Sequence, residues 1–174
     1  MSKLKEQNDV ILDVGCGTSK ETDTIYFTEY KFCPIRAGPE ATFLDISIPK
    51  LRIKNFIRGD AQNLPFRGNS FEEIYASHVL EHLDEPLKFL WDARRVLVRG
   101  GRLHVWVPNF TCREYDPSHK HVFNYYSLKS LFRDRGFRVF IRLPFVLVGF
   151  LPKKIGRLIS ALFTYEIYVE AIRN

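Results

Sequence analysis

Short runs of apolar residues recur along the chain and predict its strands. Each run is too short to form a helix, and several alternate between apolar and polar residues, which is typical of strands. Three of the runs have an acidic residue, Asp13, Asp45 or Asp60, at their last or next-to-last position. The predicted strands are 10–14, 41–46, 54–60, 71–76, 102–108, 137–143 and 165–172.

One stretch, 86–98, has the apolar spacing of an amphipathic helix. Asp84 or Glu85 would start this helix, since Pro86 suits a first turn, and the glycines at 100–101 would end it. We expect one side of this helix to be buried, formed by its apolar residues Leu87, Leu90, Trp91, Val96 and Leu97.

The remaining stretches complete the predicted architecture. Ser127 is expected to cap a second helix that runs to Gly136, whereas 22–31 suits a helix or a loop equally well. The link 45–54 is too short for a full crossover helix. Strands separated by crossovers form a mostly parallel, doubly wound α/β sheet, whose ligands bind at the carboxyl ends of the strands.

Glycines and acids cluster where the predicted strands end. Gly15 and Gly17 follow the first strand, and a Gly-x-Gly turn lets a ligand approach the backbone closely. Asp13, Asp45 and Asp60 fall at three strand ends, where they would repel a pyrophosphate. Lys20 also stands where a dinucleotide fingerprint requires a third glycine. A cationic ligand rich in hydroxyl and amine donors, such as S-adenosylmethionine, suits this edge better.

The charge is unevenly distributed over the chain. The formal net charge is +6, made up of −3 in residues 1–90 and +9 in residues 91–174. A basic second half is compatible with an ordinary solvated surface. It is equally compatible with an anionic partner such as RNA, DNA or a phosphorylated substrate.

Composition predicts a cytoplasmic protein that forms a single domain over residues 1–174. The three cysteines lack metal-type spacing and predict free thiols in a reducing compartment. The first residues do not resemble a signal peptide, and the longest apolar run, 145–151, is too short to cross a bilayer. No transmembrane segment is therefore expected.

Five motifs in order resemble the class I S-adenosylmethionine-dependent methyltransferases. The first is the glycine-rich stretch 12–17, followed by Asp45, then by 59–66. The stretch 77–83 is similar to the family's segment after the fourth strand, and 94–97 and 100–103 are similar to its next helix and the turn into strand five. The resemblance implies a Rossmann-like, mostly parallel seven-stranded sheet with an antiparallel last strand and some crossover helices reduced or missing.

The same resemblance implies S-adenosylmethionine as the cofactor and assigns residues to its parts. The glycine-rich stretch would hold the methionine end, Asp45 the ribose hydroxyls, and Asp60 the adenine amine, with a backbone contact from Ala61. The implied cofactor-binding residues are Asp13, Gly15, Cys16, Gly17, Asp45, Ile46, Asp60, Ala61, Gln62, Ser77 and His78.

Methyl transfer needs a base only if the acceptor must lose a proton. The candidate catalytic residues are His78, His119 and His121, which follow the fourth and fifth strands. Residues 78–82 also spell H-x-x-E-H, the zinc motif of inverted zincin peptidases, but their place directly after a strand disfavours a peptidase. No metal site is predicted.

The sequence therefore predicts a methyltransferase that acts on an unidentified acceptor, which could be RNA, protein or a small molecule. The alternative is a catalytically inactive S-adenosylmethionine-binding or partner subunit with the same fold, because the short chain leaves little sequence for a substrate lid. A homodimer is a further prediction, since a partner could cover a face of the sheet that lacks crossover helices.

Overall fold

Seven strands form one sheet in the computed structural model, which describes residues 10–17, 40–50, 52–110, 116–142 and 166–174. Their order across the sheet is β3-β2-β1-β4-β5-β7-β6. Six of the seven predicted strands match the observed bounds to within two residues at each end. The strands are β1 (Ile11–Val14), β2 (Thr42–Asp45), β3 (Phe56–Arg58), β4 (Phe71–Ser77), β5 (Leu97–Pro108), β6 (Phe137–Arg142) and β7 (Glu166–Arg173).

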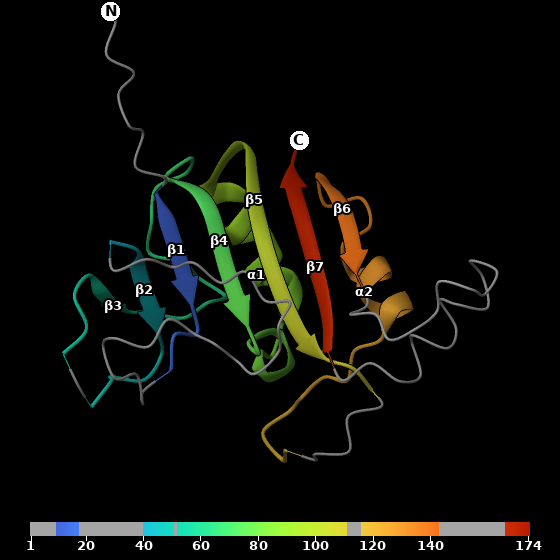
Figure 1. Ribbon diagram of the computed structural model, residues 1–174, viewed down its shortest axis with the longest axis horizontal. Helices are drawn as coiled ribbons and strands as arrows, with labels where there is room; N and C mark the ends of the chain where they lie inside the picture. The colour runs from blue at the N-terminus through green and yellow to red at the C-terminus, as the bar shows by residue number, and fades with distance from the viewer. Residues whose placement is uncertain (1–9, 18–39, 51, 111–115, 143–165) are drawn as a thin grey trace, which may run out of the picture.

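The strand directions confirm the predicted Rossmann-like topology. β1 pairs in parallel with β2 and β4, β2 with β3, and β4 with β5. Only β7 runs antiparallel, against both β5 and β6. The carboxyl ends of β1 to β5 therefore meet at one edge, the lower edge in Figure 1.

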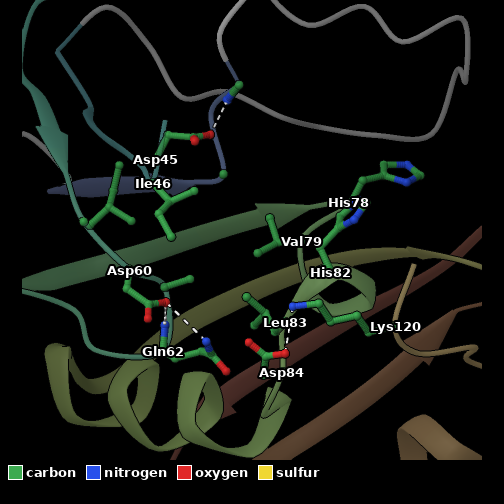
Figure 2. Close-up of a pocket in the computed structure, with 15 residues that line it drawn as sticks. Asp45, Ile46, Asp60, Gln62, His78, Val79, His82, Leu83, Asp84 and Lys120 are labelled. Carbon is green, nitrogen blue, oxygen red and sulfur yellow. Dashed lines mark hydrogen bonds and ion pairs between the residues drawn. The ribbon is translucent and has the colours of Figure 1, made fainter. Parts of the chain in front are cut away.

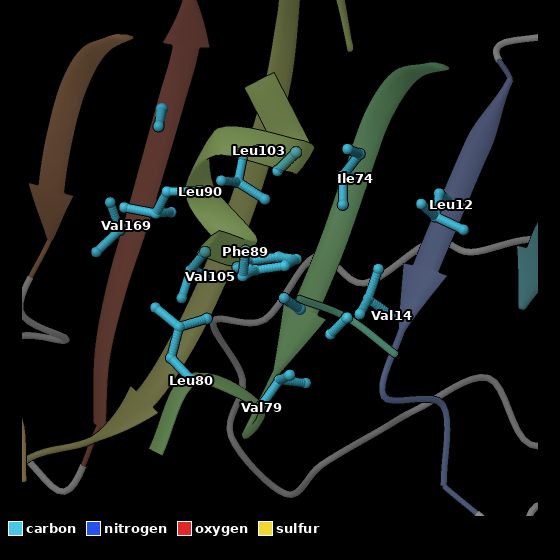
Figure 3. Close-up of a cluster of buried hydrophobic side chains, with 14 of the residues drawn as sticks. Leu12, Val14, Ile74, Val79, Leu80, Phe89, Leu90, Leu103, Val105 and Val169 are labelled. Carbon is cyan, nitrogen blue, oxygen red and sulfur yellow. The ribbon is translucent and has the colours of Figure 1, made fainter. Parts of the chain in front are cut away.

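The hydrophobic core lies between the sheet and two helices, α1 (Pro86–Val96) and α2 (Tyr125–Leu131). Alternate strand residues point toward the helices, as the two-residue strand period requires. Leu12, Ile74 and Leu103 belong to this set, and they lie in one cluster with Phe89 and Leu90 of α1 (Figure 3). Leu128 of α2 joins the same cluster, so both helices cover the same face.

The opposite face carries a row of stacked rings. Tyr75 of β4 and His104 of β5 are stacked with centroids 4.6 Å apart, and Trp106 and Tyr168 are stacked at 4.8 Å. The Nδ1 atom of His104 lies 2.7 Å from the hydroxyl of Tyr168. These neighbouring strands are thus joined by side chains as well as by backbone hydrogen bonds.

The predicted buried side of α1 is wrong in part. Leu87 and Trp91 are exposed, at 38% and 53%, whereas Phe89 and Ala93 are fully buried together with Leu90. The buried positions follow the three- and four-residue spacing of a helix, and Phe89 rather than Trp91 lies over the sheet. The predicted start is confirmed, because Glu85 is the N-cap residue and Pro86 is the first helical residue.

The predicted end of α1 is also wrong. α1 ends at Val96, and β5 begins directly at Leu97 instead of at Arg102. The pairing of β4 with β5 is interrupted, since Phe71 faces Leu97 but Glu73 faces Arg102. Between these two pairs β5 has more residues than β4, and Gly100, with a φ of +77°, is one of the additional residues. The two glycines therefore serve a bulged strand rather than a helix terminus.

The second helix begins earlier than expected. Asn124, not Ser127, is the N-cap residue, and its side chain accepts hydrogen bonds from the backbone N–H groups of Tyr126 and Ser127. The Ser127 hydroxyl bonds back to the backbone N–H of Asn124, which completes a capping box. α2 ends at Leu131, before the predicted Gly136.

The prediction that some crossover helices are reduced or missing is confirmed for the described residues. The residues described between β2 and β3, and between β3 and β4, form turns, bends and irregular segments without a helix. The undecided stretch 22–31 lies outside the described residues. In the part of the chain that the structure describes, no helix is long and apolar enough to cross a membrane.

Candidate functional site

A cavity of about 480 Å³ lies at the carboxyl edge of the sheet (Figure 2). Its size is within the range of small-molecule sites, roughly 300–1,000 Å³. Side chains and backbone from the ends of β1, β2, β3 and β4 surround it, together with one residue from the segment after β5. The lining residues are Gly15, Gly17, Leu44, Asp45, Ile46, Gly59, Asp60, Ala61, Gln62, His78, Val79, His82, Leu83, Asp84 and Lys120.

The turn after β1 forms one wall of the cavity. Gly15 has a φ of +73°, and a β-carbon there would lie 2.3 Å from Cγ2 of Val79. Gly17 has a φ of +75°, and within the described residues no atom lies within 4 Å of such a β-carbon. A left-handed backbone at both positions explains why glycine is required, because other residues are strained there.

Asp45, the last residue of β2, is held by this turn. Its Oδ2 accepts a hydrogen bond from the backbone N–H of Gly17 at 2.8 Å, and its Oδ1 accepts one from the N–H of Ser47 at 2.8 Å. A carboxylate oxygen can accept a second hydrogen bond, so both oxygens retain acceptor capacity. The carboxylate is therefore fixed in place while it can still receive hydroxyl donors from a ligand.

Asp60 follows β3 and presents a second carboxylate to the cavity. Its Oδ1 accepts the backbone N–H of Gln62 at 2.8 Å. Within the described residues, Oδ2 accepts no hydrogen bond. Asp60 can therefore receive a donor such as a ligand amine without giving up a contact.

The segment that carries Asp60 and Gln62 is attached to α1. Oε1 of Gln62 accepts the backbone N–H of Glu85 at 2.6 Å. Asp92 accepts the backbone N–H of Leu64 at 2.6 Å, and the guanidinium of Arg95 donates to the carbonyl of Leu64 at 2.9 Å. A helix thus positions a segment that has no regular structure of its own.

His78 occupies a strained position directly after β4. Its φ is +54°, which is uncommon for a residue other than glycine and costs on the order of 1–3 kcal/mol. Nε2 lies 2.8 Å from Oε1 of Glu166, and Nδ1 lies 3.2 Å from Oε1 of Glu81. These contacts, first with Glu166 and then with Glu81, raise the pKa of His78 to about 10. His78 is therefore an imidazolium near neutral pH, which can donate a proton but cannot accept one.

The wall opposite the glycine turn holds an ion pair. Nζ of Lys120 lies 2.7 Å from Oδ1 of Asp84, and this contact lowers the pKa of the Asp84 carboxyl. The charges of Asp84 and Lys120 offset each other, so among the described lining residues the other charges are the carboxylates of Asp45 and Asp60 and the His78 imidazolium. The cavity thus suits a ligand whose hydroxyl and amine donors meet the carboxylates.

The structure brings most of the predicted cofactor-binding residues together. Eight border the cavity, namely Gly15, Gly17, Asp45, Ile46, Asp60, Ala61, Gln62 and His78. Cys16 and Ser77 are next to lining residues in the chain, and Asp13 is two residues before Gly15, but these three are not among the lining residues. Asp13 and Cys16 are buried, at 6% and 1% exposure.

The other two candidate catalytic residues, His119 and His121, lie in the segment after β5 and do not border the cavity. Nε2 of His119 lies 3.8 Å from Oδ2 of Asp116, and Nε2 of His121 lies 3.3 Å from the carbonyl oxygen of Asp84. Lys120, the residue between them, does line the cavity.

Sequence reasoning did not assign several lining residues to the cofactor site. Val79, His82, Leu83 and Asp84 lie in the turn and the short 3-10 helix η1 (Leu80–His82) that follow β4. Their position after a strand was a usable indication, but the geometry of this turn depends on the left-handed His78. Lys120 lies 36 residues beyond its partner Asp84, so the sequence contained no sign of this pairing.

Comparison with known proteins supplies the family. A family model described as a methyltransferase domain matches residues 12–105, which is more than half of the chain. The chain belongs to this methyltransferase family. It is 33% identical over 102 residues to a demethylmenaquinone methyltransferase from Renibacterium salmoninarum, and the match spans 55% of this chain but only 39% of that relative.

Solved structures confirm the fold of this family member. One is a Haloferax volcanii methyltransferase in complex with the Trm112 methyltransferase activator, with a TM-score of 0.65 and 16% identity over 94% of this chain and 82% of that one. Another is an S-adenosylmethionine-dependent methyltransferase from Archaeoglobus fulgidus, with a TM-score of 0.63 and 20% identity over 95% of this chain and 86% of that one. At these identities the likeness is one of fold.

Membership of the methyltransferase family indicates S-adenosylmethionine as the cofactor, and the cavity residues fit it. Asp45 and Asp60 offer acceptors for ribose hydroxyls and an adenine amine, and the open backbone at Gly17 leaves room beside the turn. Carboxylates also suit the positive charges of the sulfonium and the ammonium group.

Proposed function

We propose that this chain binds S-adenosylmethionine in the cavity at the carboxyl edge and transfers its methyl group to an acceptor. The observation that supports this most directly is the convergence of the glycine turn, Asp45 and Asp60 on one cavity. Three separate strand ends supply these groups, and each retains the capacity to bind a ligand.

Different residues of the cavity bind the adenine, the ribose and the methionine part of S-adenosylmethionine. Asp60 accepts the adenine amine through its unoccupied Oδ2, next to a backbone contact from Ala61. Asp45 and the neighbouring Ile46 hold the ribose. The turn from Asp13 to Gly17 holds the methionine end. Asp13 and Cys16, which are buried and do not line the cavity, stabilise the conformation of this turn and do not contact the cofactor with their side chains.

The reaction requires alignment more than proton transfer. Bound S-adenosylmethionine supplies an activated methyl group and its own leaving group, so the protein must hold the acceptor in line and exclude water. Because Glu166 and Glu81 raise the pKa of His78 to about 10, we propose a role for His78 other than taking a proton from the acceptor. We propose that it fixes the turn after β4, with Ser77 preceding it, so that Val79 and Leu83 form the apolar wall near the methyl group.

Any base that the acceptor needs must come from another element. His119 and His121 remain the candidates, because their segment already places Lys120 at the cavity wall. Reaching the cavity would require either histidine to leave its present contact with Asp116 or Asp84.

The acceptor is best sought without assuming its class. The basic second half suggested a nucleic acid, but the relative described above is named for demethylmenaquinone. Incubation with methyl-tritiated S-adenosylmethionine and fractionated RNA, protein and small-molecule pools separates these classes. We expect label in one pool.

Two variants make this labelling experiment specific. Asp60→Asn should lower the label about tenfold or more at subsaturating cofactor, because a hydrogen bond to a charged group contributes about 1.5–3 kcal/mol. Glu40→Gln, which removes an exposed carboxylate paired with Lys54 outside the cavity, should leave the label unchanged. Cofactor binding without label in any pool would contradict methyl transfer and favour a binding subunit.

A further inference from the structure

Three potential metal ligands meet beside the cofactor cavity. Glu81 and His82 belong to the 3-10 helix after β4, and His119 belongs to the segment after β5. One ligand atom from each residue lies within 4.8 Å of those of the other two, the one such grouping among the described residues. An H-x-x-E-H zinc motif would use His78 and His82 as its two histidine ligands, but His78 contacts Glu166 and Glu81.

Glu81 is the central residue of this cluster and is completely buried. Its Oε1 lies within ion-pair distance of Nδ1 of His78, at 3.2 Å, but neither carboxylate oxygen has a hydrogen-bond partner in the described chain. Burying a carboxylate is costly unless its oxygens are satisfied by hydrogen bonds, ion pairs or a metal ion. The Glu81 carboxylate is such an unsatisfied group, and one of its oxygens lies within 4.8 Å of a ring nitrogen of His82 and of His119.

His82 is fixed in a form that can bind a metal. The Ser118 hydroxyl lies 2.7 Å from Oδ1 of Asp116, to which it donates its only proton, so toward Nδ1 of His82, at 3.1 Å, it acts as an acceptor. Nδ1 therefore carries the proton, and Nε2 keeps a free lone pair. Metal-binding histidines commonly donate their other N–H to an oxygen in this way.

His119 is brought to the cluster by backbone hydrogen bonds. The carbonyl oxygen of Glu81 accepts the N–H groups of Lys120 at 2.7 Å and His121 at 3.1 Å. The rings of His82 and His119 then meet edge to face, with centroids 4.8 Å apart. Asp116 faces Nε2 of His119 at 3.8 Å, where it can orient that ring as well.

We propose that Glu81, His82 and His119 bind a divalent transition-metal ion of the Zn²⁺ type. Two imidazoles and one carboxylate form a donor set that Zn²⁺ uses with a fourth position left open. Ligand atoms around tetrahedral zinc are about 3.4 Å apart, so the cluster must contract by on the order of 1 Å. The partly exposed His119, whose side chain is 23% accessible, has room to make this adjustment.

The position of this site suggests its role. His82 also borders the cofactor cavity, and Lys120 next to His119 carries the ion pair with Asp84 on the cavity wall. A metal ion at the cluster would join the segment after β5 to the turn after β4. The ion would thereby fix one wall of the cavity whether or not cofactor is bound. A metal-bound His119 could not also act as the base, so His121 would then be the candidate for that role.

Zinc binding can be measured on the full chain without cofactor or acceptor. Protein treated with a chelator and dialysed would be titrated with ZnCl₂ by calorimetry, and bound zinc would be counted by atomic absorption after desalting. We expect one zinc per chain. Because the measurement needs no methyl donor, its outcome is independent of the proposed methyl transfer.

Variants locate the ion. His119→Ala and Glu81→Gln should each weaken zinc binding at least tenfold, whereas His121→Ala, from the same segment but outside the cluster, should not. Circular dichroism checks the fold of each variant, and the partly exposed His119 provides a test even if the buried Glu81→Gln fails to fold. Absence of stoichiometric zinc, or affinity that is unchanged in His119→Ala, would overturn the proposal.

Discussion

Gly15 occupies a point where the backbone is left-handed and where a β-carbon would lie 2.3 Å from Cγ2 of Val79. Gly15→Ala should therefore cost about 1–3 kcal/mol of unfolding free energy from overpacking, in addition to about 1 kcal/mol of backbone strain. Urea unfolding measures this cost.

Two further variants separate these causes. Gly17→Ala has similar strain without a neighbouring atom, so it should cost only the smaller amount. Val79→Ala removes the clashing methyl group, so the double variant should be more stable than the sum of its single changes predicts. Strict additivity would show that the contact with Val79 is not the cause.

His104 is a buried histidine whose pH dependence can be predicted. Desolvation by burial lowers the pKa of His104, and the nearby carboxylates of Glu73 and Glu170 offset this only in part. The folded state then binds a proton less readily than the unfolded state does. The free energy of unfolding should accordingly fall as the pH drops below about 6.5.

The variant His104→Gln isolates this contribution. Between pH 8 and pH 5 the natural protein should lose more stability than the variant, measured by urea unfolding at each pH. Carboxylates elsewhere titrate equally in both proteins, so they cancel in the difference. If both proteins lost the same free energy of unfolding, His104 would not contribute to the pH dependence of stability.

At the scale of single elements, the two aromatic residues of α1 differ in burial and should therefore differ in their contribution to stability. Phe89 is fully buried against the sheet, whereas Trp91 is 53% exposed and has the guanidinium of Arg135 over its ring at 5.6 Å. Phe89→Ala should cost about 3–5 kcal/mol of unfolding free energy. Trp91→Ala should cost much less, and thermal or urea unfolding of both variants would show the order. The reverse order would place Trp91 in the core.

The existence of the elements could be predicted from the sequence, but some of their boundaries could not. Apolar runs identified all seven strands because a buried strand needs little else. The switch from α1 to β5 at Leu97 was missed because Gly100 resembles a helix terminus in sequence. Only its pairing with β4 shows that it belongs to a bulged strand. The cap at Asn124 was missed because Ser127 has the same local chemistry.

At the scale of the whole molecule, the cofactor side of the site was predictable and the opposite wall was not. Asp45 and Asp60 could be placed because parallel strands end at a common edge. The contacts of His78 with Glu166, and of Lys120 with Asp84, join segments far apart in the sequence and depend on the tertiary fold. The single domain, the homodimer and the cytoplasmic location remain predictions.

The binding of S-adenosylmethionine to the purified chain is the measurement that tests the proposed site most directly. Calorimetry should show one equivalent bound, with affinity reduced about tenfold or more in Asp60→Ala and unchanged in Glu40→Gln. S-adenosylhomocysteine, its demethylated product, should compete. Absence of binding by both compounds, or equal affinity in Asp60→Ala, would contradict the assignment of this cavity to the methyl donor.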